Sequence, residues 1–515
     1  MKFGFSGGRI AVVGAVVVTA LFLIQGVAPA ASPAGTNYNV VRAIPLPNGL
    51  SVGQLDISWV DPYVRAYFLA DDANASLDLL DLNTGTLSMI TPKGASAFAG
   101  FPQDPNVPGH NEISGPNGVI TVHHAEVWVG DSPTFSGPIV ANTNLATAYA
   151  TDNCNSSAKV ISILDQTVTD VINTGGCFRA DELAWDSTDE VVLIANPSEQ
   201  FIGKASSVGF ITLISSLPVL PGAHHPILKK INFDGTNGTP NAVGGIEQPV
   251  WSSLTGLFYI SIPQNGPADT AGNGAVAVVD PVAMKVVNVF PLTGGCGPSG
   301  SALGPNYELY LGCSGPTQII DIRTGAMIAS FPQITGCDEV YYNSGDNTFG
   351  GGCASALGLV NNGTTPPSFI QKISGITHSA SADSLSLGIV APVPSTSKFP
   401  LCGPLPNKGC IAVFAAVPLP TQAILTVSSA STSQQGDVAI GTASMSASGN
   451  LTYQFVAVPG GTTGKTPVVA PSGLTGEALV YFNQGPGNYS VQLTVTDGAG
   501  NTSTSAPVTI TYTGS

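Results

Sequence analysis

The sequence predicts an all-β protein, a β-propeller of seven blades followed by a small antiparallel β-sandwich. Its 515 residues include 61 glycines and 40 prolines, a composition typical of many short strands joined by tight turns. A degenerate four-strand unit recurs between residues 38 and 416 with a spacing of roughly 40 to 60 residues, the period of propeller blades. After residue 420 the pattern changes to a plain alternation of apolar and polar residues, which indicates half-buried strands.

The charge composition excludes several classes of protein. Only 9% of the residues are charged, and 32 acidic against 16 basic residues give a net charge of -16. Nucleic acid is excluded as a partner because the chain lacks the basic surface that phosphate contacts require. Disorder is excluded as well, since a chain that is 43% hydrophobic can bury enough surface to offset its ordering entropy.

The N-terminal segment predicts export. Lys2 and Arg9 precede the apolar stretch Ile10 to Ile24, and Ala28-Pro-Ala30 provides a small-residue cleavage site. We interpret residues 1–30 as a signal peptide, with an uncleaved signal anchor as the alternative. Either interpretation places the protein outside the cytoplasm, as a secreted, periplasmic or cell-surface protein. Any membrane contact would then run through this segment, if it is not cleaved.

The eight cysteines agree with export, because an even number of cysteines in an exported chain favours disulfides. No C-x2-C pair occurs, which argues against ligation of a metal by cysteine. We predict that they pair sequentially: Cys154 with Cys177, Cys296 with Cys313, Cys337 with Cys353, and Cys402 with Cys410.

The clearest copy of the repeat starts at Asp56 and ends at the turn Asn83-Thr-Gly85. The predicted blades span residues 54–91, 112–175, 181–233, 247–293, 297–333, 337–373 and 377–416. Only three strands are evident in the last blade. We expect Tyr38 to Pro45 to supply its outer strand and so to close the ring with both ends of the chain. Six or eight blades are the alternatives.

Within the first blade, the segments Asp56-Ile-Ser-Trp-Val-Asp-Pro62 and Arg65-Ala-Tyr-Phe-Leu-Ala-Asp71 resemble the strand pair of YVTN/NHL-type repeat propellers of exported proteins. The resemblance covers most of residues 38–416. It implies the fold, but it is weak for function, because that family includes binding scaffolds, lactonases, lyases and proteins without a known activity.

Pro418 and Pro420 predict a linker over residues 418–422, between a propeller at 31–417 and a sandwich at 423–515. The segment Gly487 to Gly500 resembles the last strand pair of PKD and related immunoglobulin-like domains. The middle of this region departs from the PKD pattern, so we describe the sandwich as immunoglobulin-like.

One position of the repeat is rich in acidic residues. Five blades carry Asp56, Asp181, Glu247, Asp338 and His378 at this position, five residues before Asp61 and its equivalents Asp186, Ser252, Asn343 and Asp383. Blade two carries Pro116 there, with Glu112 shortly before it, and blade five carries Ser299. Innermost strands line the central channel of a propeller, so these side chains are expected to form a ring at one mouth.

Carboxylates that converge on an axis repel one another unless they are protonated or neutralised by a cation. We therefore predict a hard-cation site, with Ca²⁺ as the ion, formed by Asp56, Glu112, Asp181, Glu247, Asp338 and His378. The alternative is that these acids bond to amides of neighbouring innermost strands and solvate a water-filled channel. Two histidine pairs, His123-His124 and His224-His225, are expected to be loop or surface residues, because adjacent strand residues face opposite sides.

The sequence has no G-x-S-x-G, H-E-x-x-H or C-x-x-C-H motif. This favours a secreted or cell-surface binding and scaffold protein, with a protein or a carbohydrate at the cell surface as partner. The alternative is an extracytoplasmic metal-dependent lactonase or lyase, with His378 or Glu112 as the acid-base group. A structural cell-wall or surface-layer protein is the second alternative.

Overall fold

The computed structural model describes the following residues: 38–101, 113–132, 155–197, 209–220, 222–267, 269, 272–385, 388–397, 401–402, 408–415, 423–427, 431–432, 436–443, 452–459, 465–471, 477–496 and 502–514. The expected signal segment at 1–30 and the candidate ring residue Glu112 lie outside them. Within the described part of the chain, no helix is long and apolar enough to cross a membrane. The helices there are three short 3-10 turns: η1 (Pro47–Gly49), η2 (Asp72–Asn74) and η3 (Gly94–Ser96).

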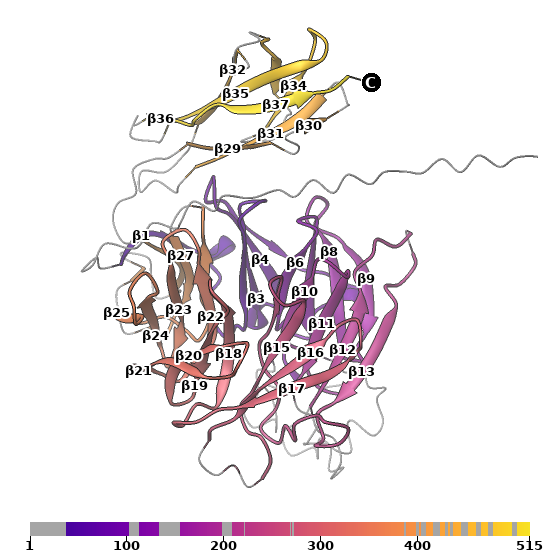
Figure 1. The fold of residues 1–515 in the computed structure, drawn as a ribbon, viewed down its shortest axis with the longest axis vertical. Helices are drawn as coiled ribbons and strands as arrows, with labels where there is room; N and C mark the ends of the chain where they lie inside the picture. The colour runs from indigo at the N-terminus through magenta and orange to yellow at the C-terminus, as the bar shows by residue number, and fades with distance from the viewer. Residues whose placement is uncertain are drawn as a thin grey trace, which may run out of the picture.

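Seven four-stranded antiparallel sheets form the propeller (Figure 1). From the inner to the outer strand, the first three are β2 (Ser58–Asp61), β3 (Ala66–Asp71), β4 (Ser76–Asp81), β5 (Leu87–Ile90); β6 (Val119–Val122), β7 (Glu126–Asp131), β8 (Ser157–Ser162), β9 (Val168–Asn173); and β10 (Leu183–Asp186), β11 (Val191–Asn196), β12 (Phe210–Ser215), β13 (Ile227–Asn232). The next three are β14 (Pro249–Ser252), β15 (Leu257–Ile262), β16 (Ala275–Asp280), β17 (Lys285–Pro291); β18 (Pro298–Leu303), β19 (Glu308–Cys313), β20 (Pro316–Asp321), β21 (Met327–Thr335); and β22 (Cys337–Asn343), β23 (Thr348–Cys353), β24 (Ala356–Asn361), β25 (Ser368–Ser374). The predicted count of seven blades is confirmed.

The seventh sheet closes the ring with both ends of the propeller chain. It consists of β26 (Ser381–Asp383), β27 (Gly388–Val393), β28 (Cys410–Ala415) and, as its outer strand, β1 (Asn39–Ile44). The antiparallel register places β1 alongside the whole length of β28. The prediction that the segment before blade one supplies this strand is therefore confirmed.

A buried polar seam joins blades one and seven. Arg65, in the turn between β2 and β3, forms an ion pair with Asp383 at the end of β26, and both side chains are almost completely buried. The hydroxyl of Ser381 donates to the carbonyl oxygen of Ser58 at 2.7 Å. The hydroxyl of Ser379 donates to the hydroxyl of Ser58 at 2.9 Å. The first and last blades are thus held by specific contacts between their innermost strands as well as by the outer strand.

The hydrophobic core lies between neighbouring blades. One cluster of buried side chains combines Leu193 of blade three with Phe258 of blade four, and another combines Tyr67 of blade one with Val413 of blade seven. Each sheet therefore buries both of its faces, which explains strands such as β3 and β11 whose residues are all buried.

The repeated aspartates at strand ends have a structural role in the turns. The Asp61 carboxylate accepts a hydrogen bond from the amide of Tyr63 at 2.8 Å. In the outer hairpins of blades one and five, Asp81 accepts from Asn83 and Asp321 from Arg323, each at 2.8 Å. Such Asx turns fix the hairpins in the same way in different blades, so these acids are not candidates for ligand binding.

Three disulfides close loops at the end of the propeller where the innermost strands begin: Cys296–Cys313, Cys337–Cys353 and Cys402–Cys410. These are three of the four sequential pairs predicted. Cys177 is also disulfide-bonded, and its predicted partner Cys154 lies outside the described residues.

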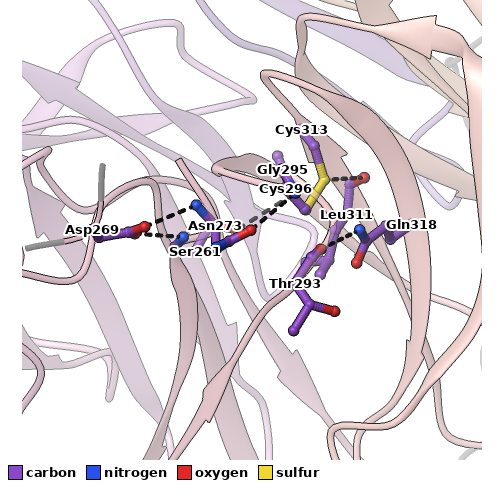
Figure 2. The surroundings of a disulfide bond; sticks show 11 residues. Ser261, Asp269, Asn273, Thr293, Gly295, Cys296, Leu311, Cys313 and Gln318 are labelled. Atoms are coloured by element: carbon purple, nitrogen blue, oxygen red, sulfur yellow. Dashed lines mark hydrogen bonds between the residues drawn. A yellow bond between two sulfur atoms is a disulfide. The ribbon is translucent and has the colours of Figure 1, made fainter. Parts of the chain in front are cut away.

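Figure 2 shows the first of these bridges, which ties the loop before β18 to the end of β19. Hydrogen bonds extend from this loop to the preceding blade, because the Gly295 amide donates to Asn273 at 2.9 Å and the Asn273 amide donates to Asp269 at 3.1 Å. On the other side, the Gln318 side chain donates to the Thr293 carbonyl at 2.7 Å. Disulfides are typical of oxidising, extracytoplasmic compartments.

The C-terminal region forms two further sheets. One has the order β29 (Ala423–Val427), β31 (Gly436–Ala443), β34 (Glu477–Tyr481), β33 (Val468–Pro471), and the other β30 (Ser431–Thr432), β37 (Val508–Tyr512), β35 (Gly487–Thr496), β32 (Thr452–Val458), with β36 (Thr502–Thr504) paired to β35. The second sheet is mixed, because β30 runs parallel to β37. Leu425 and Val480 of the first sheet share one core with Tyr489 and Leu493 of the second.

The seam between blades one and seven yields a prediction about stability. Asp383→Asn removes the buried partner of Arg65, so we expect the free energy of unfolding to fall by about 3 to 5 kcal/mol, as for other buried pairs that lose one charge. Urea unfolding followed by circular dichroism measures it. Arg323→Gln, which breaks the exposed pair with Asp321, is the control and should leave the urea midpoint nearly unchanged. An equal effect of both variants would contradict a stabilising role of the buried pair.

Candidate functional site

Two cavities adjoin the innermost strands of the propeller. The first, of about 540 Å³, is a bowl at the end where these strands begin, and its wall comes from blades five, six, seven and one. It includes Gly53–Leu55, Gly336–Asp338 and Ile376–His378, which lie at or before the starts of β2, β22 and β26, together with Pro394 and Thr396 of the connection between β27 and β28. Cys337 of this wall is bonded to Cys353, so a disulfide restrains one side of the bowl.

The second cavity, of about 340 Å³, is the axial channel, because its wall takes residues from the innermost strand of every blade. One example from each blade is Trp59, Thr121, Trp185, Trp251, Ala302, Tyr342 and Ala382. The two cavities meet at the start of β22, because Asp338 lines the bowl and the next residue, Glu339, lines the channel. The bowl and the channel are therefore neighbours.

The predicted ring residues begin the innermost strands at equivalent backbone positions. The amides of Asp56, Asp181 and Glu247 donate to the carbonyl oxygens of Ala70, Ala195 and Ser261, at 2.9 to 3.0 Å, in blades one, three and four. Asp338 is the second residue of β22, and His378 lies three residues before β26. Four of the six candidate residues, Asp56, Asp181, Asp338 and His378, interact electrostatically with one another.

The register in blade two differs from the predicted one by one residue. There the amide of Asn117 makes the equivalent bond, to Gly130 at 2.8 Å, so the ring position is Asn117 rather than Pro116. Its side chain donates to the carbonyl oxygen of Ala180 at 3.2 Å. The offset could not be read from the sequence, because blade two has Val122 where blades one, three and seven carry a turn-forming aspartate.

Two cations of the protein itself lie within the ring. The Nη1 atom of Arg179 is 3.7 Å from Asp56 Oδ2, and its Nε atom is 3.1 Å from Asp181 Oδ2. The Nε2 atom of His378 is 3.5 Å from the other oxygen of Asp56. Arg179 was missed by the sequence analysis because no repeated position holds an arginine. It supplies part of the positive charge that the sequence analysis assigned to a metal ion.

The ion pairs set the protonation of the ring. Burial disfavours the imidazolium of His378, but the hydrogen bond to Asp56 and the charges of Asp338 and Glu339 raise its pKa to about 9. Burial also opposes ionisation of Asp56, yet the bond to His378 and the charge of Arg179 hold its pKa below the ordinary value. For Asp338, burial prevails and raises the pKa. His378 is therefore a cation at neutral pH.

A pair of buried glutamates forms the next layer along the axis. Glu182 and Glu339 follow Asp181 and Asp338 directly, and their carboxyl groups interact electrostatically. Burial raises the pKa of Glu339 to about 8, and burial with the charge of Glu339 raises that of Glu182 well above its usual range. The sequence does carry a signal for this layer, since the dipeptide Asp-Glu occurs at the same place in blades three and six.

The calcium site stays a prediction. Among the described residues, no group of three or more histidine, cysteine, aspartate or glutamate side chains is arranged so that it could hold a metal ion. Glu112, one of the predicted ligands, lies outside that part of the chain. The charge of Glu247 raises the pKa of Glu182, so Glu247 lies near this layer of the axis.

The four clustered histidines pair with carboxylates of neighbouring blades. His123 Nε2 lies 2.6 Å from Glu190, and His124 Nδ1 lies 2.8 Å from Asp61. His224 and His225 both reach Asp170, at 2.6 and 2.9 Å. They can share it because they precede β13 rather than lie in a strand. All four lie outside the strands, as expected for loop residues, although His225 is only 3% exposed and packs edge-on against Trp128.

The fold and these two cavities define the protein as a seven-bladed β-propeller with a charged axis, extended by a C-terminal pair of sheets. No protein-family model matches the chain, and no curated protein is significantly similar to it in sequence.

The ring predicts a pH dependence of stability. The pKa of His378 is raised from 6.5 to about 9, so its stabilisation is complete below pH 6.5 and is lost as the pH rises through 9. We expect the Tm to fall between pH 7 and 10, and to fall less in His378→Gln. Differential scanning calorimetry measures both. His124→Gln, at a side chain that is 45% exposed, should keep the wild-type slope; equal slopes in all three proteins would contradict the assignment.

Proposed function

We propose that the protein is a secreted or cell-surface binding and scaffold protein that holds its ligand at the bowl and channel of the propeller. One observation carries the proposal: an axial channel lined by all seven blades adjoins a bowl whose wall includes the disulfide-bonded Cys337. Concave sites with a few convergent polar groups are the usual places for ligands. The sequence supports an extracytoplasmic location through its predicted signal segment.

The protonation of the ring favours binding over catalysis. A general base near neutral pH needs a pKa close to the working pH, whereas that of His378 is about 9. Asp56 is engaged by both Arg179 and His378. These groups hold charge in fixed positions, which suits recognition of a polar ligand rather than proton transfer.

The C-terminal sheets have a core of their own, made of residues from position 423 onward. We assign them the role of an immunoglobulin-like spacer or adhesive module of the PKD type. The propeller is assigned to the YVTN/NHL-type repeat propellers, on the residues of its first blade. Both assignments rest on resemblance of sequence, supported by the seven four-stranded sheets and the additional pair.

An array of oligosaccharides, lysine-rich peptides and glutamate-rich peptides tests this function with the full chain immobilised through its C-terminus. We expect saturable binding to a subset of the array, weakened at least tenfold by Asp338→Asn, because Asp338 faces the bowl. Asp165→Asn, in an exposed turn of blade two, is the matched control and should bind as the wild type does.

Two outcomes would overturn the proposal. The first is the absence of saturable binding to any member of the array, or binding that Asp338→Asn leaves unchanged. The second is calcium-dependent hydrolysis of gluconolactone by the full chain that Asp338→Asn abolishes, which would identify a lactonase instead.

A further inference from the structure

The wall of the axial channel is unusually rich in indoles. The chain has four tryptophans, and three of them, Trp59, Trp185 and Trp251, line this cavity together with Tyr342. Trp59 is 38% exposed although it lies on an innermost strand. The fourth, Trp128, is completely buried between strands. Three of the four indoles therefore border the channel, while Trp185 and Trp251 also pack against the core.

Hydrogen bonds fix two of these indoles in place, whereas the Nε1 atom of Trp251 is buried without a hydrogen-bond partner. The Nε1 atom of Trp59 donates to the Thr121 hydroxyl at 3.0 Å, and that of Trp185 donates to the Ser216 hydroxyl at 3.1 Å. The first bond joins blade one to blade two, and the second lies within blade three. A site whose aromatic walls are already ordered loses little conformational entropy when a ligand enters.

Acidic groups outnumber cations along the same axis. The described carboxyl groups there are Asp56, Asp181, Glu182, Glu247, Asp338 and Glu339, against the two cations Arg179 and His378. Glu339 belongs to the channel wall itself and is 3% exposed. Burial of carboxyl groups is costly in their ionised form, and a positively charged ligand beside them would favour that form.

We propose that the axial channel binds a small organic cation, with its ammonium group at Glu339 and its hydrocarbon part against the indoles of Trp59, Trp185 and Trp251. The proposal rests on the function proposed above and names its ligand class. A cation over an aromatic face is attracted by the charge distribution of the ring, most strongly when the cation is desolvated. The volume of about 340 Å³ lies at the small end of ligand sites, which favours a slender molecule.

The chemistry of the wall distinguishes this ligand from a metal ion. Ca²⁺ takes six to eight oxygen ligands, and among the described residues no group of three or more histidine, cysteine, aspartate or glutamate side chains is arranged to hold a metal ion. An alkylammonium ion uses the indoles as well as the acid. An ammonium group beside Glu339 also favours the ionised form of its carboxyl group.

Tryptophan fluorescence of the full chain tests the proposal, because three of its four indoles line the channel. The probes are n-hexylammonium, n-hexanol and n-hexanoate, which share a hydrocarbon chain and differ in charge. We expect a saturable change of emission with n-hexylammonium, and at least tenfold weaker binding of the other two. Glu339→Gln should weaken n-hexylammonium binding at least tenfold, whereas the surface control Asp165→Asn should not change it.

Three outcomes would overturn the proposal. The first is no saturable change with n-hexylammonium, and the second is equal binding of n-hexanol. The third is displacement of n-hexylammonium by CaCl₂, which would show that the channel is a calcium site instead. If Glu339→Gln does not fold, isothermal calorimetry on wild-type protein with the three probes still decides the order of affinities. Binding on the array that depends on Asp338, without binding of n-hexylammonium, would leave the proposed function standing and remove only this ligand class.

Discussion

The closure of the ring between blades one and seven is the constraint on which the rest of the structure depends. A propeller sheet by itself leaves both faces uncovered, so every blade needs two neighbours, and the ring must close for the last blade to have them. Here the pairing of β1 with β28 and the buried pair of Arg65 with Asp383 provide that closure. The axis exists as a site only while the seven innermost strands keep their places.

The same geometry that closes the ring creates its electrostatic problem. A repeat brings the same position of every blade to one level of the axis, so an acid tolerated in one blade meets the acids of the others. The protein resolves part of this conflict with Arg179 and His378, which contact Asp56 from two sides. It resolves another part by protonation, because burial and mutual repulsion raise the pKa values of Glu182 and Glu339.

Repetition explains which features could be predicted from the sequence. Blade number, the closing strand and the ring position follow from patterns that recur, and three disulfides follow from cysteine order. Arg179 and the Glu182–Glu339 contact escaped prediction, because each depends on how unlike blades meet across the axis. Asn117 escaped for a local reason, since blade two has Val122 where blades one, three and seven carry the aspartate that anchors the alignment.

The acids on the axis are notable because charged residues are scarce in this chain. Only 9% of the residues are charged, so charge is not spread evenly for solubility, and the buried carboxyl groups of the axis add nothing to the hydrated surface. Apolar residues of similar volume would stabilise such a centre better than partly neutralised acids do. Carboxyl groups kept at this cost, next to ordered indoles and an open cavity, are placed for a partner that arrives with positive charge.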